Sequence, residues 1–431
     1  MGICLFKPPY RHPYNPPPPD GDKIIGIAIP LLLLTFYGYT LSGHWSLGKL
    51  VIVALVGLWL ALGPVYRAGV FPLAYLAAIT TTTLTSADVW LSTWSLWGTY
   101  TSGLICALAL IPYWACIDPR HRPGLETGIR VGAFIMATVG LLQWAGVSWL
   151  TPDELFTGRR VYATLGSPIY VGAAAALCYP YCKSQIEKLF LIAVLVASGS
   201  RGAWVAVACG TIYLNWPSFT IRARTWGLVA VGAGLIGALW LRPVSDLGRI
   251  VTWAAAIDAF KARPWLGWGT GNFLMVAEIW RNPAWLEVYG QTTQDHAHNL
   301  FLEAAACSGL LGLSGIAGLL YTLWIYSDRV TRSALLGVFF VGMLNPLPMV
   351  VKALCLALAA SCSTVKTVVS KPISRAVQCI FVVASMTISC MVHWDRMMTF
   401  WNDAPWSFSS EKAMYYAGVI KDVIHRAMFK L

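Results

Sequence analysis

Apolar runs close to the length of a membrane-spanning helix recur along the whole chain. Residues 31–34 and 173–177 are apolar on every side, whereas a half-buried strand would alternate apolar with polar residues. A helix needs roughly 20 residues to cross a bilayer. Only 12% of the residues are charged, which excludes an ordinary soluble globular domain. The sequence therefore predicts an all-α, polytopic integral membrane protein.

The apolar runs predict about 12 or 13 crossings, and the basic C-terminal end, which favours the cytoplasm, selects about 12 transmembrane helices. The candidate spans are 24–41, 48–65, 70–86, 99–117, 131–150, 166–182, 189–200, 203–216, 225–241, 299–325, 333–346, 348–364 and 376–393.

Positive charge indicates which loops face the cytoplasm. Lysine plus arginine number 31 against 19 aspartate plus glutamate, an excess that membrane proteins place in cytoplasmic loops facing anionic lipid, so it does not indicate nucleic acid. Successive cytoplasmic loops are separated by an even number of crossings. This parity places the loop 151–160, the hairpin tip 198–202 and the long loop 242–298 on the outer face.

The organisation that follows has five parts. They are a cytoplasmic N-terminal tail (1–23), transmembrane helices 1 to about 9 (24–241), a long outer loop containing short helices (242–298), C-terminal transmembrane helices (299–393) and an interfacial C-terminal tail (394–431).

The outer loops contain arginines that break the positive-inside trend. A guanidinium on this face is a candidate ligand for an anion, because it binds phosphate oxygens in a bidentate way. The alternative is that each arginine extends from a helix end to lipid headgroups. These residues are Arg159, Arg160, Arg201, Arg242, Arg249, Arg263 and Arg281.

The long loop begins with an amphipathic helical pattern over 244–262, with Ile250, Trp253, Ala254 and Ile257 at helical spacing. This pattern predicts a helix at the membrane surface that ends before Pro264. The glycine-rich stretch 265–273 lacks the form of a dinucleotide-binding loop. We interpret it as a bend that places tryptophans in the membrane interface.

Two histidines occur at the outer mouth of the following span. His296 and His298 lie between Asp295 and Glu303, and histidine is the side chain best suited to accept a proton near neutral pH. A metal site would need a third ligand cluster, which the outer loops lack. The other alternative is that Asp295 or Asn299 caps a helix beside incidental histidines.

Taken together, these motifs resemble the O-antigen ligase and O-antigen polymerase superfamily of bacterial inner-membrane glycosyltransferases. Four motifs occur in the family's order: Arg-Arg-Val-Tyr-Ala-Thr-Leu-Gly-Ser-Pro at 159–168, Ser-Arg-Gly-Ala at 200–203, the stretch 249–273 that ends in Arg-Pro-Trp-Leu-Gly-Trp-Gly-Thr-Gly-Asn-Phe, and His-Ala-His-Asn-Leu-Phe-Leu-Glu at 296–303, followed by Gly-Leu-Leu-Gly at 309–312.

The resemblance implies an enzyme that moves a glycan from an undecaprenyl-type diphosphate carrier to an acceptor hydroxyl. It implies no metal and no cofactor, a multi-pass location in the bacterial inner membrane, and an active site on the periplasmic face, so that the loop 242–298 is expected to be a periplasmic catalytic loop. It also implies roles for individual residues. His298 is the expected base, with His296 next and orienting the acceptor, and the diphosphate is expected to bind Arg201 and Arg249 first, supported by Arg159, Arg160 and Arg242.

The expected reaction is that of an O-antigen ligase, which joins a lipid-linked polysaccharide to a lipid A core or similar acceptor. The closest alternative is a polymerase, which uses the same donor but accepts another lipid-linked repeat. A protein O-oligosaccharyltransferase is the third reading. A lipid or glycan transporter is the fourth, with Lys352 as the main candidate for a buried charge.

Overall fold

The computed structural model describes most of the region between residues 20 and 363. The described residues are 20–36, 45–62, 64–66, 70–94, 103–147, 160–222, 225–227, 229, 232, 243–281, 283–289 and 294–363. The candidate span 376–393, most of the candidate span 225–241, the C-terminal tail and nearly all of the N-terminal tail lie outside them. Every regular element within the described ranges is an α- or 3₁₀-helix, which confirms the all-α class.

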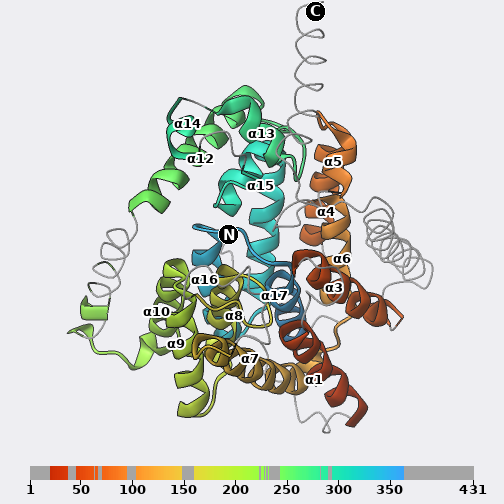
Figure 1. Ribbon diagram of the computed structural model, residues 1–431. Coiled ribbons are helices and arrows are strands. Elements are labelled where there is room, and N and C mark those ends of the chain that lie inside the picture. The colour runs from red at the N-terminus through yellow and green to blue at the C-terminus, as the bar shows by residue number, and fades with distance from the viewer. Residues whose placement is uncertain are drawn as a thin grey trace, which may run out of the picture.

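The helices follow one another along the chain as Figure 1 shows. They are α1 (Asp20–Thr35), α3 (Trp45–Ala61), α4 (Val70–Leu84), α5 (Val89–Trp94), α6 (Leu104–Ala115), η1 (Pro119–His121), α7 (Arg122–Trp144), α8 (Pro168–Cys178), η4 (Tyr179–Tyr181), α9 (Gln185–Ser198), α10 (Arg201–Asn215), η5 (Trp216–Ser218), α12 (Pro243–Ala262), α13 (Phe273–Trp280), α14 (Pro283–Tyr289), α15 (Leu300–Tyr326), α16 (Arg329–Gly342) and α17 (Met349–Cys362).

Two described helical segments, Pro119–Trp144 and Leu300–Tyr326, are long and apolar enough to cross a membrane. Four shorter apolar helices accompany them, at Lys49–Ala61, Pro72–Leu84, Leu104–Ala115 and Met349–Cys362. The other predicted spans within the described residues also fall on helices. The number of crossings and the side of each loop stay predictions.

Alanine-rich helices form the centre of the larger of two hydrophobic cores. Residues 173–176 of α8 are all buried alanines, and α17 buries a similar run of small side chains. Small side chains let neighbouring backbones approach closely. α8 therefore packs against α9, α10, α16 and α17 at once, while α17 also contacts α3 and α6.

The segment predicted as the long loop folds into three helices with a core of its own. Phe273 and Trp285 are fully buried there against the small residues of α12 and the start of α15. Figure 1 shows α12, α13 and α14 gathered at one end of α15. The helix predicted over 244–262 is confirmed, and it ends one residue before Arg263.

Close helix contact is most extreme between α1 and α7. A Cβ added to Gly26, Gly124 or Gly128 would lie closer than 3.0 Å to backbone atoms of the partner helix. These positions therefore require glycine, because a side chain would push the two backbones apart.

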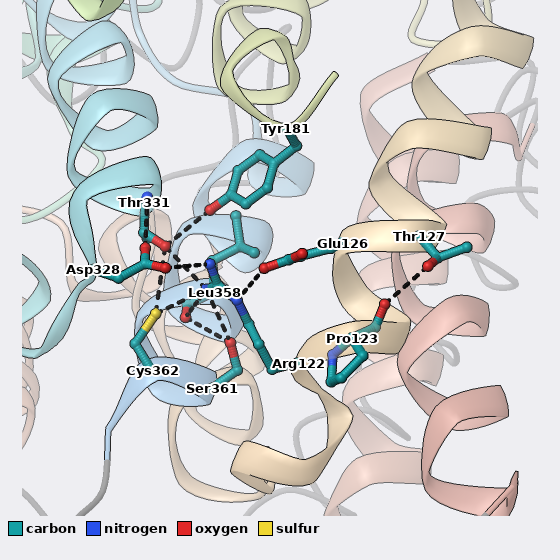
Figure 2. Close-up of polar contacts among 10 residues, drawn as sticks. All are labelled: Arg122, Pro123, Glu126, Thr127, Tyr181, Asp328, Thr331, Leu358, Ser361 and Cys362. Atoms are coloured by element: carbon teal, nitrogen blue, oxygen red, sulfur yellow. Dashed lines mark hydrogen bonds and ion pairs between the residues drawn. The ribbon is translucent and has the colours of Figure 1, made fainter. Parts of the chain in front are cut away.

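Arg122, near the start of α7, joins three further parts of the bundle (Figure 2). Its guanidinium binds Glu126 at 2.7 Å, Asp328 at 2.9 Å and Thr331 at 3.0 Å. The same group donates to the Sγ of Cys362 at 2.8 Å, and the Oη of Tyr181 lies 2.9 Å from Thr331. The network ties α7 to η4, to the beginning of α16 and to the end of α17.

A break inside α15 holds the turn that follows α12. Gly309 has φ 59° and ψ −160°, which interrupts the helical hydrogen bonds. The freed N–H groups of Leu310 and Leu311 donate instead to the carbonyl oxygens of Pro264 and Trp265, at 2.8 and 3.2 Å. A Cβ on Gly309 would meet the Trp265 backbone, so this close approach requires glycine.

The bend predicted over 265–273 is confirmed as a turn, but its two tryptophans differ. Trp268 is buried within the protein: its indole donates to the Ala259 carbonyl at 2.9 Å, and the Arg263 guanidinium lies 4.2 Å from its ring centre. The placement of Trp268 in the membrane interface was therefore wrong. Trp265 is 71% exposed, and its placement in the membrane interface stays a prediction.

Candidate active site

The predicted hairpin tip between α9 and α10 is confirmed. Gly199 ends α9 in the left-handed region at φ 60°, a conformation that glycine adopts without strain. Arg201 is the first residue of α10 and is partly exposed. The start of a helix carries a partial positive charge, so this tip favours an anion beside Arg201.

Arg160 lies against the same tip. Its Nε donates to the Ser198 carbonyl at 2.8 Å. The loop that carries Arg160 is held by Gln143, whose Oε1 accepts from the backbone N–H of Tyr162 and Ala163 at 3.2 and 2.8 Å. Ala163 has φ 45°, so these hydrogen bonds hold a strained backbone in place.

Arg249 reaches the tip from α12 through an asparagine that the sequence analysis missed. Its Nη2 donates to the Oδ1 of Asn345 at 3.3 Å. Asn345 lies in the turn between α16 and α17 and is only 2% exposed. A Cβ on Gly202, the second residue of α10, would lie 3.4 Å from the Asn345 Nδ2. In the sequence, Asn345 is recognisable only as part of an Asn-Pro pair, which is a general turn signal.

The histidines lie directly before α15. Asn299 caps that helix, because its Oδ1 accepts from the N–H of Phe301 and Leu302 at 2.9 and 3.1 Å. Asp295 makes no such cap and hydrogen-bonds to the Nδ1 of His296. The capping alternative is therefore confirmed for Asn299 and wrong for Asp295. His298 has φ 52°, a strained conformation of the kind that gathers at functional sites.

Asp295, His296 and His298 form a hydrogen-bonded series. The Nε2 of His296 lies 3.2 Å from the Nδ1 of His298. When Asp295 is ionised and His296 is neutral, His296 carries its proton on Nδ1 and presents a lone pair on Nε2. His298 must then carry its own proton on Nδ1. This tautomer leaves the Nε2 of His298 as an acceptor, with no hydrogen-bond partner among the described residues.

Electrostatics keep His298 neutral. Burial lowers the pKa of His298 from its ordinary 6.5 to about 3, and the charge of Arg249 and that of His296 whenever it is protonated act in the same direction, while Asp295 acts in the opposite direction. At neutral pH its imidazole is therefore unprotonated and able to accept a proton.

Close approaches and an electrostatic effect link several of the predicted residues. Arg160 lies against the hairpin tip, Asn345 approaches Gly202 of that tip and accepts from Arg249, and the charge of Arg249 acts on His298. Arg159 and Arg242 lie outside the described residues. Two other arginines predicted on the outer face have local partners: Arg263 stacks on Trp268, and Arg281 pairs with Glu278 at 3.4 Å. Within the described ranges, no cluster of three or more His, Cys, Asp or Glu side chains could hold a metal ion.

An apolar cavity of about 310 Å³ lies along α15 and reaches the beginning of that helix. Its wall includes Leu300 and Phe301, which follow His298 in the chain, together with side chains of α4, α6, α16 and α17. Lys352 of α17 is the one charged residue of this lining. The cavity suits a long apolar group whose head lies near the histidines.

The architecture defines a class: an apolar helical protein whose site combines guanidinium groups suited to a diphosphate with a neutral histidine suited to act as a base. Comparison with known proteins agrees with this class.

Residues 188–317 match the family model described as O-Antigen ligase. The chain is also 25% identical over 350 residues to the exopolysaccharide production protein ExoQ of Rhizobium meliloti (strain 1021), covering 68% of this chain and 74% of that protein. The predicted resemblance to the O-antigen ligase family is confirmed, and the matched segment contains Arg201, Arg249, His296 and His298.

Proposed function

We propose that this protein is a glycosyltransferase that moves a glycan from a polyprenyl-diphosphate carrier to an acceptor hydroxyl, with O-antigen ligation to a lipid A core as its reaction. The observation that carries the proposal is the series Asp295, His296 and His298 beside Arg249, within the segment that matches the O-antigen ligase family. The proposal places this site on the periplasmic face of a bacterial inner membrane.

The acceptor hydroxyl attacks the anomeric carbon of the donor sugar. Nε2 of His298 takes the hydroxyl proton as the new glycosidic bond forms, and the bond between the anomeric carbon and the diphosphate oxygen breaks. The positive charge that develops on His298 is stabilised through His296 by the Asp295 carboxylate. General-base catalysis of this kind contributes roughly 10²- to 10⁴-fold to the rate.

The diphosphate leaves with growing negative charge, which guanidinium groups stabilise where it develops. The position of Arg201 at the start of α10 and the hydrogen bond from Arg249 to Asn345 support this role for the two arginines. Arg160 supports them from the other side of the hairpin tip. Arg159 and Arg242 stay supporting candidates on the sequence evidence.

The apolar cavity supports a lipid-linked donor. A polyprenyl chain is flexible and wholly apolar, and the cavity wall is apolar apart from Lys352. A chain seated there extends its head toward Leu300 and thus toward His298. A soluble sugar nucleotide would gain nothing from such a surface.

A polymerase is the second candidate, because the similarity to a protein named for exopolysaccharide production favours chain assembly. It would use the same donor and the same base but would accept the sugar of a second lipid-linked repeat. The two readings therefore differ only in the acceptor.

Purified protein in proteoliposomes with an undecaprenyl-diphosphate-linked glycan tests the proposal, with and without a lipid A core acceptor. A product formed only with the core supports ligation, and a ladder of lengths formed without it supports polymerisation. His298→Ala should abolish either product. His121→Gln is the matched control, because His121 lies in η1 beside Asp118, away from the site. Absence of any glycan transfer by the wild type would contradict the proposed function.

A further inference from the structure

Asn345 occupies the point where three distant parts of the chain meet. Its backbone N–H continues the end of α16 by donating to Val341 at 2.8 Å, so the residue is fixed in place. Its Oδ1 accepts from Arg249 of α12, and its Nδ2 faces Gly202 of α10. That Nδ2 makes no hydrogen bond to a described residue, although the side chain is almost fully buried.

We propose that Asn345 is a positioning residue for the donor diphosphate: it holds the Arg249 guanidinium against the start of α10. This inference rests on the proposed function. It makes the α16–α17 turn, which lies beyond the segment matched by the ligase family, part of the donor site.

The side-chain chemistry at position 345 explains why an amide suits this role. An amide oxygen orients a guanidinium without neutralising its charge, so Arg249 still attracts the diphosphate. A carboxylate would hold Arg249 more strongly but would cancel its charge and repel the anion. The second half of the amide also provides an N–H donor beside Gly202, where a phosphate oxygen could accept it.

Two substitutions separate positioning from a purely structural role. Asn345→Leu keeps the approximate volume but removes the acceptor for Arg249. Asn345→Asp keeps the acceptor and adds a negative charge. A structural role predicts that Asn345→Asp behaves like the wild type, because the hydrogen bond to Arg249 survives. The positioning role predicts that both variants lose donor affinity.

The experiment measures the Kd of the full-length protein in lipid nanodiscs for undecaprenyl diphosphate, together with KM and kcat for the lipid-linked glycan. Both Asn345 variants should raise Kd and KM roughly ten- to hundredfold, since a hydrogen bond to a charged group is lost or an anion is repelled. Their kcat should change much less. Asn215→Leu is the matched control, because Asn215 donates to Thr211 at 2.8 Å at the opposite end of α10.

A double-mutant cycle shows whether Asn345 acts through Arg249. In an Arg249→Gln background, Asn345→Leu should cause little further loss of affinity. Independent, additive losses of affinity in the cycle would overturn the proposal. Asn345 variants whose Kd and KM equal those of Asn215→Leu would overturn it as well. A wild-type protein that neither binds the lipid diphosphate nor transfers glycan would instead count against the proposed function itself.

Discussion

In the proposed mechanism, Asp295 determines which nitrogen of His298 faces the acceptor. Its carboxylate keeps the His296 proton on Nδ1, and this in turn keeps the His298 proton on Nδ1. Asn in place of Asp removes the negative charge that stabilises the imidazolium and no longer enforces the proton on His296 Nδ1, because an amide can donate as well as accept. We expect Asp295→Asn to lower kcat by roughly 10²-fold or more while KM for the donor changes little. Steady-state kinetics in proteoliposomes measure this.

Asp258→Asn is the control for that substitution, because Asp258 pairs with Lys261 on the exposed side of α12. A kcat for Asp295→Asn within a factor of about three of the wild type would remove Asp295 from the proton path, since general-base catalysis contributes far more than this.

His298 also gives the stability of the protein a pH dependence. Its pKa is about 3 in the folded protein and 6.5 in the unfolded chain, so the unfolded state binds the proton first as the pH falls. The stabilisation is fully present above about pH 6.5 and is lost as the pH falls toward 3. The thermal unfolding midpoint should therefore drop between pH 7.5 and pH 5.0, and it should drop less in His298→Gln. Equal drops in the two proteins would contradict the buried, neutral state of His298.

The contact between α1 and α7 depends on hydrogen as the only side chain at three positions. In Gly128→Ala the new Cβ would meet the backbone of Ile27, so one helix must shift. We expect the free energy of unfolding to fall by roughly 1–3 kcal/mol, which is the usual cost of overpacking. Denaturation in detergent, followed by circular dichroism, measures the loss.

Gly21→Ala is the same substitution in open space, where an added Cβ meets nothing within 4 Å. It should leave stability unchanged or raise it slightly, because alanine favours the helix. If both variants behaved alike, the close approach of α1 and α7 would not limit stability.

The Arg122 network joins helix ends that are remote from the histidines. Lysine at this position keeps the charge but cannot reach Glu126, Asp328 and Thr331 together. We expect Arg122→Lys to lower stability by about 2 kcal/mol while kcat at temperatures below unfolding stays near that of the wild type. The thermal midpoint and the transfer rate test this jointly. Arg222→Lys, at an exposed position after α10, should change neither quantity.

Much of the helical pattern could be predicted from the sequence, and so could the histidine segment. The apolar runs and the Ser-Gly-Ser tip were sufficient for α9 and α10, because a helix needs a long apolar run and glycine ends it. Ile250 and Ile257 form an apolar stripe on α12 and are 59% and 41% exposed. This exposure is what a helix with its apolar face against a membrane surface requires. The opposite face of the same helix is buried through small alanines, which carry no strong periodic signal.

Asn345 could not be predicted, because its role depends on tertiary contact alone. It lies 96 residues from Arg249 in the chain, and nothing in its local sequence distinguishes it from any other turn asparagine. The tautomers of the histidines likewise depend on Asp295 lying in the correct geometry, which composition and spacing do not specify. Pairings that join distant segments are the part of the site that only three-dimensional structure supplies.

Cysteine labelling tests which side of the membrane each loop faces. In the proposed topology α12 lies outside and the turn before α9 lies in the cytoplasm. Cysteine placed at Lys261, whose side chain is 68% exposed, should react with a membrane-impermeant maleimide in spheroplasts. Cysteine placed at Lys183, also exposed, should react only after permeabilisation. The unmodified protein provides the background from its 11 native cysteines. The opposite labelling pattern would invert the topology.

The break at Gly309 bears on how the protein is made. In hydrocarbon, the N–H groups of Leu310 and Leu311 would each cost several kcal/mol if they lacked acceptors. Pro264 and Trp265 supply those acceptors and are translated before α15 emerges from the ribosome. The broken form of α15 is therefore stable in the bilayer only when the preceding turn is docked on it, because without the turn these N–H groups find acceptors only in a continuous helix.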